Sequence, residues 1–364
     1  MDELRRYDAH LGHPAGMDVS GISREGVVLP VRVDPTGVDG PKRREAAGPA
    51  WRTAGRGWFV PSYVDAAPPL QRIVEAATRL PDTGAVTGWA GLCWGGGRYF
   101  GGLDASGKER LDVPLALDNR RKLRLQDGIE LCEEFLSAGD ITVVDGLPIT
   151  VHPRSVCRIL RGTRSLERRV AMLDMAAFDD LCSLDEVFEY AVTHLSGRPH
   201  VSRIWSALPH AHENSWSPRE PVMRLVWVHE GGLPEPLVNM PLFDGAGNHL
   251  VTPDLLDPVA GVVGEYDGAG HEGLDPRRRD LDREELYRDL GLELVTMVSA
   301  DNRDRDRFVR RLRSAYDRAR RRRATSAWTL RQPSWWVDTS TVARRRALTA
   351  SQREVWLRRQ RPAA

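Results

Sequence analysis

The chain has 364 residues, of which 41% are hydrophobic and 28% charged, and its formal net charge is +1. No stretch approaches the about 18–20 apolar residues that a membrane-spanning helix needs, and the first residues lack the apolar core of a signal peptide. The four cysteines lie far apart without the CxxC spacing of a zinc site. We therefore expect a cytoplasmic protein with reduced thiols, no membrane partner and, from its length, two domains.

Strand and helix patterns alternate in the first half of the chain. The predicted elements are strands at 26–33, 57–60, 112–117, 141–144 and 147–151, and a helix at 69–80. Asp145 and Gly146 separate two β-branched runs, which predicts a tight hairpin turn. From about 154 to 208 the apolar spacing becomes helical and predicts three or four helices. We expect residues 1–210 to form a mixed α+β region.

A polar stretch at 210–218 predicts the domain boundary, and a second pattern begins there. Ser217 and Pro218 are typical of a helix start, and Glu220 stands where a capping-box glutamate would. The expected elements are helices at 217–229, 279–290 and 303–323, and strands at 237–243, 249–256, 259–267 and 292–298. The order α-β-β-β-α-β-α predicts an α+β (α/β-like) domain at 211–325 with a mixed sheet, followed by a basic tail at 326–364.

Acidic residues gather where two of these predicted strands end. Glu265 and Asp267 are two residues apart in one strand, so they share a face, and Asp254 lies near the end of the preceding strand. If the two strands pair, Asp254 comes close to Glu265, and their repulsion in a low dielectric would be relieved by Mg²⁺ or Mn²⁺. His271, after the glycine turn, could carry a proton.

Each of these residues also has a purely structural interpretation. Asp267 begins an Asp-Gly turn, Asp254 could cap a turn, and Glu220 could serve only the helix start. A single histidine such as His271 is commonly a surface residue. The order of the residues along the chain favours a shared site over these separate interpretations.

Positive charge is concentrated at the end of the chain. Residues 301–364 contain 19 arginines and 6 acidic residues, and no lysine follows Lys122. We predict DNA-backbone contacts by Arg310, Arg311, Arg313, Arg320 and Arg321, with a solvated helix face as the alternative. Trp335 and Trp336 are interpreted as anchors of the tail, with stacking on bases as the alternative.

The acidic pattern resembles a known nuclease family. Residues 217–299 resemble the Vsr-like and DUF559 branch of the PD-(D/E)XK superfamily. The resemblance lies in Glu220 of SPREPVMRL, in Pro253-Asp254, in Glu265-Tyr-Asp267-Gly268-x-x-His271, and in Asp280-x-x-Arg283 before Gly291. It implies a restriction-endonuclease-like fold and metal-dependent DNA cleavage.

The same resemblance implies roles for individual residues. Glu220, Asp254 and Glu265 would gather around the metal. Asp267 stands where the superfamily has a lysine, so His271 or Arg283 would supply the proton transfer or positive charge. Asp267 and His271 would orient or activate the attacking water, and Arg283 is also counted among the DNA contacts.

The first half resembles a different group. Residues 56–65, 85–97 and 144–160 are similar to actinobacterial proteins that join an AbiEi-antitoxin-like region to a DUF559 nuclease. Two main hypotheses follow. The chain is a Mg²⁺-dependent DNA endonuclease, acting in defence against foreign DNA or in repair, or it is a non-catalytic DNA-binding or toxin-antitoxin regulator with a protein partner for its first half. A third is that the first half alone does the biological work.

Overall fold

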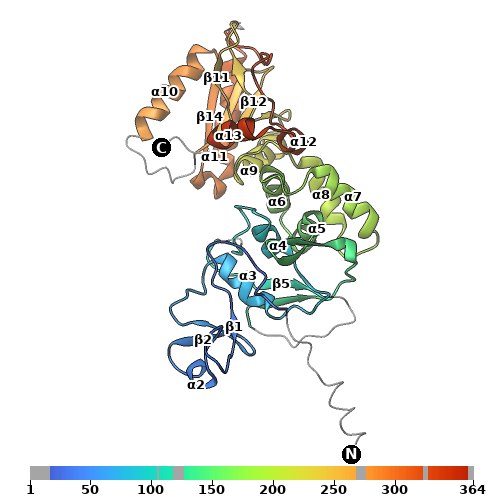
Figure 1. Cartoon of the computed structure of the whole chain (residues 1–364). Helices are drawn as coiled ribbons and strands as arrows, with labels where there is room; N and C mark the ends of the chain where they lie inside the picture. Colours follow the sequence, from blue (N-terminus) through green and yellow to red (C-terminus); the bar gives the residue numbers. More distant parts are fainter. Residues whose placement is uncertain (1–16, 105, 118–126, 268–275, 323–326, 360–364) are drawn as a thin grey trace, which may run out of the picture. The chain divides into compact units, whose positions relative to one another are not determined.

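The structure, a computed structural model, describes residues 17–104, 106–117, 127–267, 276–322 and 327–359. Its contacts divide the chain into a first unit, Met1–Ile159, and a second unit, Leu160–Ala364. Both units combine helices with mixed sheets, which confirms the expected α+β class (Figure 1). None of the helices in the described ranges is long and apolar enough to cross a bilayer.

The predicted elements of the first unit appear in the predicted order, although most strands are shorter than predicted. The short elements at 43–46, 51–55, 85–86, 88–94 and 129–132 were not predicted. In chain order the elements are β1 (Val31–Arg32), α2 (Arg43–Ala46), β2 (Trp51–Gly55), β3 (Trp58–Pro61), α3 (Pro69–Ala77), β4 (Ala85–Val86), α4 (Gly88–Trp94), β5 (Val113–Ala116), β6 (Ile129–Cys132), β7 (Ile141–Val144), β8 (Leu147–Thr150) and α5 (His152–Gly162).

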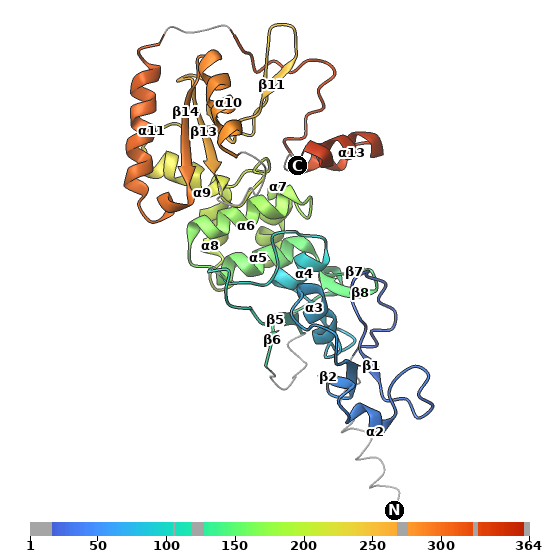
Figure 2. The ribbon, with the colours of Figure 1, turned by 90° about the vertical axis from the view of Figure 1, so that its left-hand side faces the viewer.

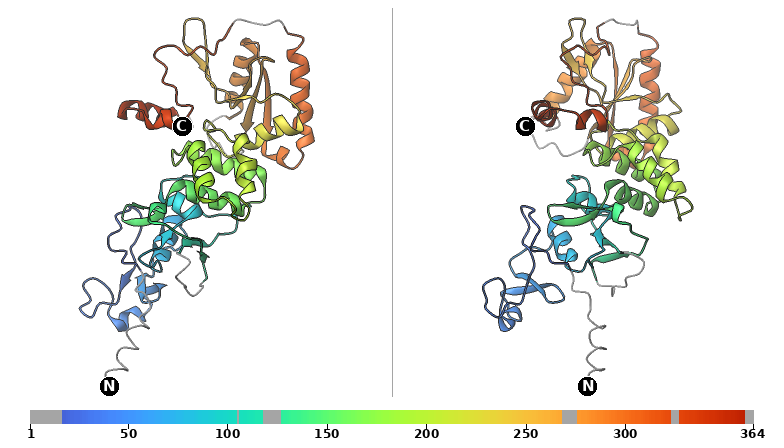
Figure 3. Two further views of the ribbon diagram at one scale, coloured as in Figure 1. Left: turned by 90° about the vertical axis from the view of Figure 1, so that its right-hand side faces the viewer. Right: turned by 45° about the vertical axis from the view of Figure 1, so that its right-hand side comes forward.

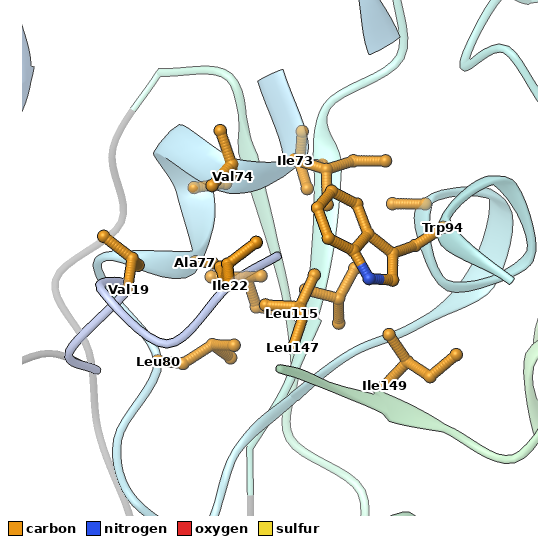
Figure 4. Close-up of a cluster of buried hydrophobic side chains, with 14 of the residues drawn as sticks. Val19, Ile22, Ile73, Val74, Ala77, Leu80, Trp94, Leu115, Leu147 and Ile149 are labelled. Carbon is orange, nitrogen blue, oxygen red and sulfur yellow. The ribbon is translucent and has the colours of Figure 1, made fainter. Parts of the chain in front are cut away.

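Two sheets organise the first unit, one ordered β1-β3-β2 and one ordered β6-β5-β4-β8-β7. Strands β7 and β8 form the predicted hairpin, and its turn residues Asp145 and Gly146 have φ values of 46° and 81°. The larger sheet packs against α3 and α4 through an aliphatic core around Trp94 (Figure 4). The Trp94 indole nitrogen donates to the carbonyl of Val144 at 2.8 Å, so the ring is both packed and hydrogen-bonded.

The second unit begins with helices and continues into a sheet. Its elements are α6 (Leu166–Phe178), α7 (Leu184–His194), α8 (Ser202–Ala207), α9 (Glu220–Leu225), β9 (Leu237–Val238), β10 (Leu242–Phe243), β11 (His249–Val251), β12 (Leu255–Asp257), β13 (Val262–Asp267), α10 (Pro276–Asp289), β14 (Glu293–Val298), α11 (Arg305–Ala319), α12 (Val342–Arg346) and α13 (Ala350–Arg359). A π-helical turn at Val226–Glu230 extends α9.

The sheet of the second unit has the order β14-β13-β12-β9, with β10 and β11 as a separate hairpin. Strand β13 runs parallel to β14 and antiparallel to β12. Helix α11 covers one face and α10 the other (Figure 2). Two of the three strands predicted at 237–267 are each divided into two short strands, β9 and β10 in the first and β11 and β12 in the second. The division arises because the chain leaves the sheet to form the β10–β11 hairpin.

Two apolar layers hold this sheet, and strand alternation separates them. Val262 of β13 packs with Phe308 and Leu312 of α11, whereas the next residue, Val263, packs with Tyr287 of α10. Side chains of successive strand residues point to opposite faces, so Glu265 shares the α10 face with Val263. Burial on both faces explains why β13 is apolar until its last three residues.

The helices at 166–207 belong to the second unit, whereas the sequence analysis assigned them to the region before residue 210. Asp174 of α6 and Arg224 of α9 form a buried ion pair at 2.9 Å. The Asp174 carboxylate also accepts from the Ser215 hydroxyl and the backbone nitrogen of His212. The 210–218 stretch that predicted a boundary is thus a folded link between α6 and α9.

The predicted basic tail is largely folded against the same unit (Figure 3). Thr329 bridges to Phe243 of β10 through the backbone. Arg345 of α12 is fully buried, and its guanidinium contacts Asp180 and the carbonyls of Ala177 and Thr339. The described part of the tail therefore adds packing surface to the domain.

Candidate metal and nucleic-acid site

The register of two strands brings the predicted acids together. Leu255 of β12 pairs with Gly264 of β13, so the preceding residue, Asp254, lies opposite Glu265. Directly opposed residues in an antiparallel pair share a face and have closely spaced side chains. The backbone nitrogen of Tyr266 donates to Asp254 Oδ2 at 2.8 Å and fixes that carboxylate beside β13.

Glu265 is buried and engaged by two donors from α10. The Tyr287 hydroxyl donates to Glu265 Oε1, and Arg283 Nη2 lies 2.9 Å from the same oxygen. Burial, together with the charge of Asp254, raises the pKa of Glu265 to about 8, although Arg283 and Tyr287 oppose the shift. This carboxyl therefore holds a proton more readily than an ordinary glutamate does.

Glu220 stands at the start of α9 and is 3% exposed. Its Oε2 accepts from the Trp216 backbone nitrogen at 2.8 Å and from Asn239 Nδ2 at 2.6 Å. Burial raises the pKa of Glu220 well above its ordinary value, and the charge of Asp254 raises it further. The bond to Trp216 fits the helix-start interpretation, and the influence of Asp254 shows that Glu220 also belongs to the acidic group.

Asp254 links these two acids electrostatically. Its carboxylate is enclosed although the residue keeps some exposed surface, and this burial raises its pKa against the opposing effects of the Tyr266 N–H and Arg283. Glu220, Asp254 and Glu265 are named here the carboxylate cluster. Asp267 lies exposed at the end of β13, on the same face as Glu265 by alternation. His271 lies outside the described residues.

The carboxylate cluster suits a hard divalent cation by the chemistry of its oxygens. Within the described ranges, no three His, Cys, Asp or Glu side chains are placed to hold an ion together. Mg²⁺ is commonly held by one or two carboxylates, with the other positions taken by waters and substrate oxygens. The opposed pair Asp254 and Glu265 meets that requirement. Glu220, already bound by two donors, lies within electrostatic reach of Asp254.

The predicted DNA-binding arginines occupy different places. Arg310 and Arg311 line a groove of about 600 Å³ beside β14 together with Arg307 and Arg318. The guanidinium of Arg313 instead lies beside the carbonyls that end the π-helical turn. Arg320 and Arg321 are exposed just past the end of α11, and Arg283 sits at the carboxylate cluster.

The groove follows an open sheet edge, since β14 is the outermost strand of its sheet. Arg311 donates to the Thr296 carbonyl at 3.0 Å and pairs with Asp301 at 2.6 Å. Arg307, Arg310 and Arg318 are exposed at the same groove. The groove is therefore a positively charged surface of the kind that contacts phosphates.

Three residues were not predicted from the sequence: Tyr287 and Asn239 at the carboxylate cluster, and Arg307 in the groove beside β14. Tyr287 could have been found, because it follows Arg283 by four residues and so lies on the same helix face. Asn239 hydrogen-bonds to Glu220 through its side chain and to the Asp254 carbonyl through its backbone nitrogen. It could not be predicted, because it stands in an apolar stretch without a recognisable motif. Arg307 was not singled out from the many arginines around it.

No protein-family model, no curated protein and no solved structure matches this chain. The similarity to PD-(D/E)XK nucleases and to AbiEi-like proteins therefore stays a prediction from the motifs.

Proposed function

We propose that the chain is a divalent-cation-dependent DNA endonuclease whose second unit has a restriction-endonuclease-like arrangement. The observation that supports this most strongly is the opposed pair Asp254 and Glu265, with Glu220 within electrostatic reach of Asp254. A fold seldom keeps three buried acids within electrostatic reach of one another unless their repulsion serves a site. The arginine-lined groove beside β14 offers a surface for the phosphate backbone.

In this proposal Asp254 and Glu265 would hold Mg²⁺ or Mn²⁺. The bound ion would polarise a phosphoryl oxygen and acidify a water for in-line attack. The chain's own groups prepare the site. Tyr266 N–H and Tyr287 OH hold the two carboxylates in place.

Arg283 supplies fixed positive charge beside Glu265, where the family pattern would have placed a lysine at Asp267. Asp267, exposed on the same face, is positioned to orient a water. Arginine stays protonated at every working pH, so Arg283 can stabilise developing negative charge but cannot act as the base.

The ion pair between Arg283 and Glu265 favours a second candidate function, that of a non-catalytic DNA-binding or toxin-antitoxin regulatory protein. Arg283 already neutralises part of the carboxylate cluster, as a structural cation would. A regulator of this kind would bind DNA equally well in EDTA and in Mg²⁺, and it would not depend on Asp254.

Nicking of supercoiled plasmid across Mg²⁺, Mn²⁺, Ca²⁺ and EDTA tests the nuclease. We expect cleavage with Mg²⁺ or Mn²⁺ and at least a hundredfold loss in Asp254→Asn, because the substitution removes a charged oxygen ligand. Asp185→Asn, which changes an exposed aspartate of α7 in the same unit, is the matched control and should cleave normally. If Asp254→Asn cleaves as well as the parent, the proposed function is wrong.

A further inference from the structure

Strand β14 forms an open edge of the sheet in the second unit (Figure 2). It is six residues long and pairs with β13 along its whole length, without a bulge. Across the described ranges, no strand pairs with its other side. Folded proteins commonly block such an edge with proline, lysine or a bulge, because an open edge is a template for a further strand. The sequence of β14, ELVTMV, contains neither proline nor lysine.

The register with β13 determines which backbone groups face this edge. The Glu293 N–H donates to the Gly261 carbonyl at the start of β13, at 2.9 Å. Successive residues of a strand direct their N–H and C=O to opposite sides, so Leu294 and Thr296 direct theirs away from β13. The Thr296 carbonyl accepts from Arg311 at 3.0 Å. Within the described part of the chain, the Leu294 N–H and C=O and the Thr296 N–H have no hydrogen-bond partner.

Arginine-lined grooves flank the open edge on both sides. The groove of about 600 Å³ lies on the α11 side, and a second groove, of about 250 Å³, lies on the α10 side. Both grooves include Leu294 and Thr296, the two residues whose backbone groups face the edge. The arginines of the two grooves are Arg307, Arg310, Arg311 and Arg318 in the first and Arg288 and Arg322 in the second. The edge is therefore a line of backbone groups between two positive surfaces.

Three of these arginines carry charge that is not neutralised. Arg288, Arg307 and Arg310 are exposed and form no ion pair with the described residues, whereas the other three are paired with buried acids. No acidic side chain lines the groove on the α11 side, while Glu284 and Glu293 line the groove on the α10 side. The excess of positive charge is therefore greatest on the α11 side, where a ligand would best place its carboxylates.

A DNA backbone would use only part of this surface. Phosphate oxygens accept hydrogen bonds from arginines, but a phosphodiester has no donor for the Leu294 carbonyl. An extended polypeptide supplies both N–H and C=O groups at the spacing of a strand. Its alternate side chains share one face, so acidic residues at every second position would all meet the arginines of α11. The backbone groups and the charge together favour an acidic strand.

We propose that the edge of β14 is a docking site for an extended acidic segment of a partner protein, which joins the sheet as a further strand. The acidic residues of the segment face Arg307 and Arg310. The residues between them are apolar and lie on the face of Leu294, which belongs to the apolar layer under α10. This inference does not depend on the proposed function. A partner bound there would cover the surface that the proposed function assigns to the phosphate backbone.

Fluorescence anisotropy of a labelled peptide tests the inference with the full chain at low salt, without DNA or divalent cations. The probe is a peptide of the length of β14 that alternates glutamate and valine and is blocked at both ends. We expect saturable binding. The same peptide with glutamine in place of glutamate should bind at least tenfold more weakly, because it lacks the charges that meet the arginines. Equal binding of the two peptides, or no binding of the probe, overturns the proposal.

Methylation of the peptide backbone separates strand addition from attraction between charges. Alternate N–H groups of an added strand face β14, and the others face solvent. Methyl groups on the glutamate nitrogens and on the valine nitrogens should therefore have unequal effects. One methylated peptide should lose at least tenfold in affinity, and the other should bind as the probe does. Equal affinities would leave the groove to charge alone, as a DNA backbone would use it, and would overturn the proposal.

Two variants of the protein locate the added strand. Thr296→Pro removes an N–H from the open edge and leaves the pairing with β13, since proline is tolerated where its nitrogen faces away from the sheet. It should weaken binding of the probe about tenfold. Arg310→Glu reverses a free charge of the groove and should weaken binding at least tenfold.

Arg198→Glu is the matched control, because it makes the same change at an exposed arginine after α7. It should bind the probe as the parent does. Unchanged binding in both Thr296→Pro and Arg310→Glu contradicts the docking site. Plasmid nicking is a separate measurement, so failure of the nuclease leaves this site standing, and failure of the peptide to bind leaves the nuclease standing.

Discussion

The two units each contain a mixed sheet packed by helices, but they bury polar groups of different kinds. Among the described residues of the first unit, the larger sheet carries a chain of buried hydroxyls, in which Thr150 lies 2.8 Å from Thr87 and 2.7 Å from Ser155. Its buried charges are limited to the pair Asp140 and Arg154. The described part of the second unit buries many more charged side chains: Arg169, Asp174, Glu220, Arg224, Asp257, Glu265, Glu293, Asp301 and Arg345.

Most of these charges in the second unit are compensated, as burial demands. Asp174 meets Arg224, Asp301 meets Arg311, and Glu293 meets Arg318 and Arg322. The carboxylate cluster differs, because the charge of Asp254 raises the pKa values of both Glu220 and Glu265, and Arg283 lies beside Glu265. Most buried charges of the second unit thus have a partner of opposite sign, whereas the repulsion between neighbouring acids distinguishes the candidate site.

The largest expected effect comes from breaking a compensated pair. Arg224→Met leaves the Asp174 carboxylate buried without its cation and should lower the free energy of unfolding by about 3–5 kcal/mol. Urea unfolding followed by tryptophan fluorescence measures it. Arg158→Met breaks the more accessible pair with Glu130 in the first unit, whose side chains are 23% and 55% exposed, and should cost about 1 kcal/mol. Similar losses in the two variants would contradict the distinction between a buried and an accessible ion pair.

An intermediate effect concerns the carboxylate cluster and pH. The folded pKa of Glu265 is raised from its ordinary value of 4.5 to about 8, so the folded protein binds more protons than the unfolded chain between these values. Stability should therefore fall as the pH rises through this window. Glu265→Gln removes the contribution and should gain stability relative to the parent, on the order of a few kcal/mol at pH 8 and close to none at pH 4.5.

Thermal unfolding of the parent and Glu265→Gln across this pH range, without divalent cations, provides the measurement. The shifts of Asp254 and Glu220 have the same sign, so part of the slope should persist in the variant. Glu284→Gln removes an exposed carboxylate of α10 and should change stability by less than about 0.5 kcal/mol. A difference between parent and Glu265→Gln that does not grow with pH would argue against the buried acidic state of Glu265.

The smallest effect concerns the arginine-lined groove. Arg307→Ala and Arg310→Ala each remove one exposed cation beside β14, and each should reduce the slope of log affinity for DNA against log salt by about 1. Arg164→Ala removes an exposed arginine before α6 and serves as the control. An unchanged slope in both groove variants would show that DNA does not follow the edge of β14.

Many helices and strands could be predicted from the sequence, whereas the elements that each of them packs against could not. Ser183 and Ser165 at helix starts, the Asp145-Gly146 turn and the apolar run before Glu265 are local signals, because backbone hydrogen bonding and side-chain alternation act over a few residues. The membership of α6 to α8 in the second unit was missed. It follows from long-range contacts such as the Asp174–Arg224 pair, whose members are far apart in the chain.

For the candidate site, the sequence alone determined which acids would share a strand face and that basic charge would gather near the end of the chain. These follow from strand alternation and from composition. Only the tertiary structure decided that Asp254 stands opposite Glu265, that Tyr287 and Arg283 hold Glu265, and that Trp336 of the tail packs against β10. Strand register and long-range packing determine these contacts. Both depend on how apolar surface is buried across the whole unit, which a short stretch of sequence does not specify.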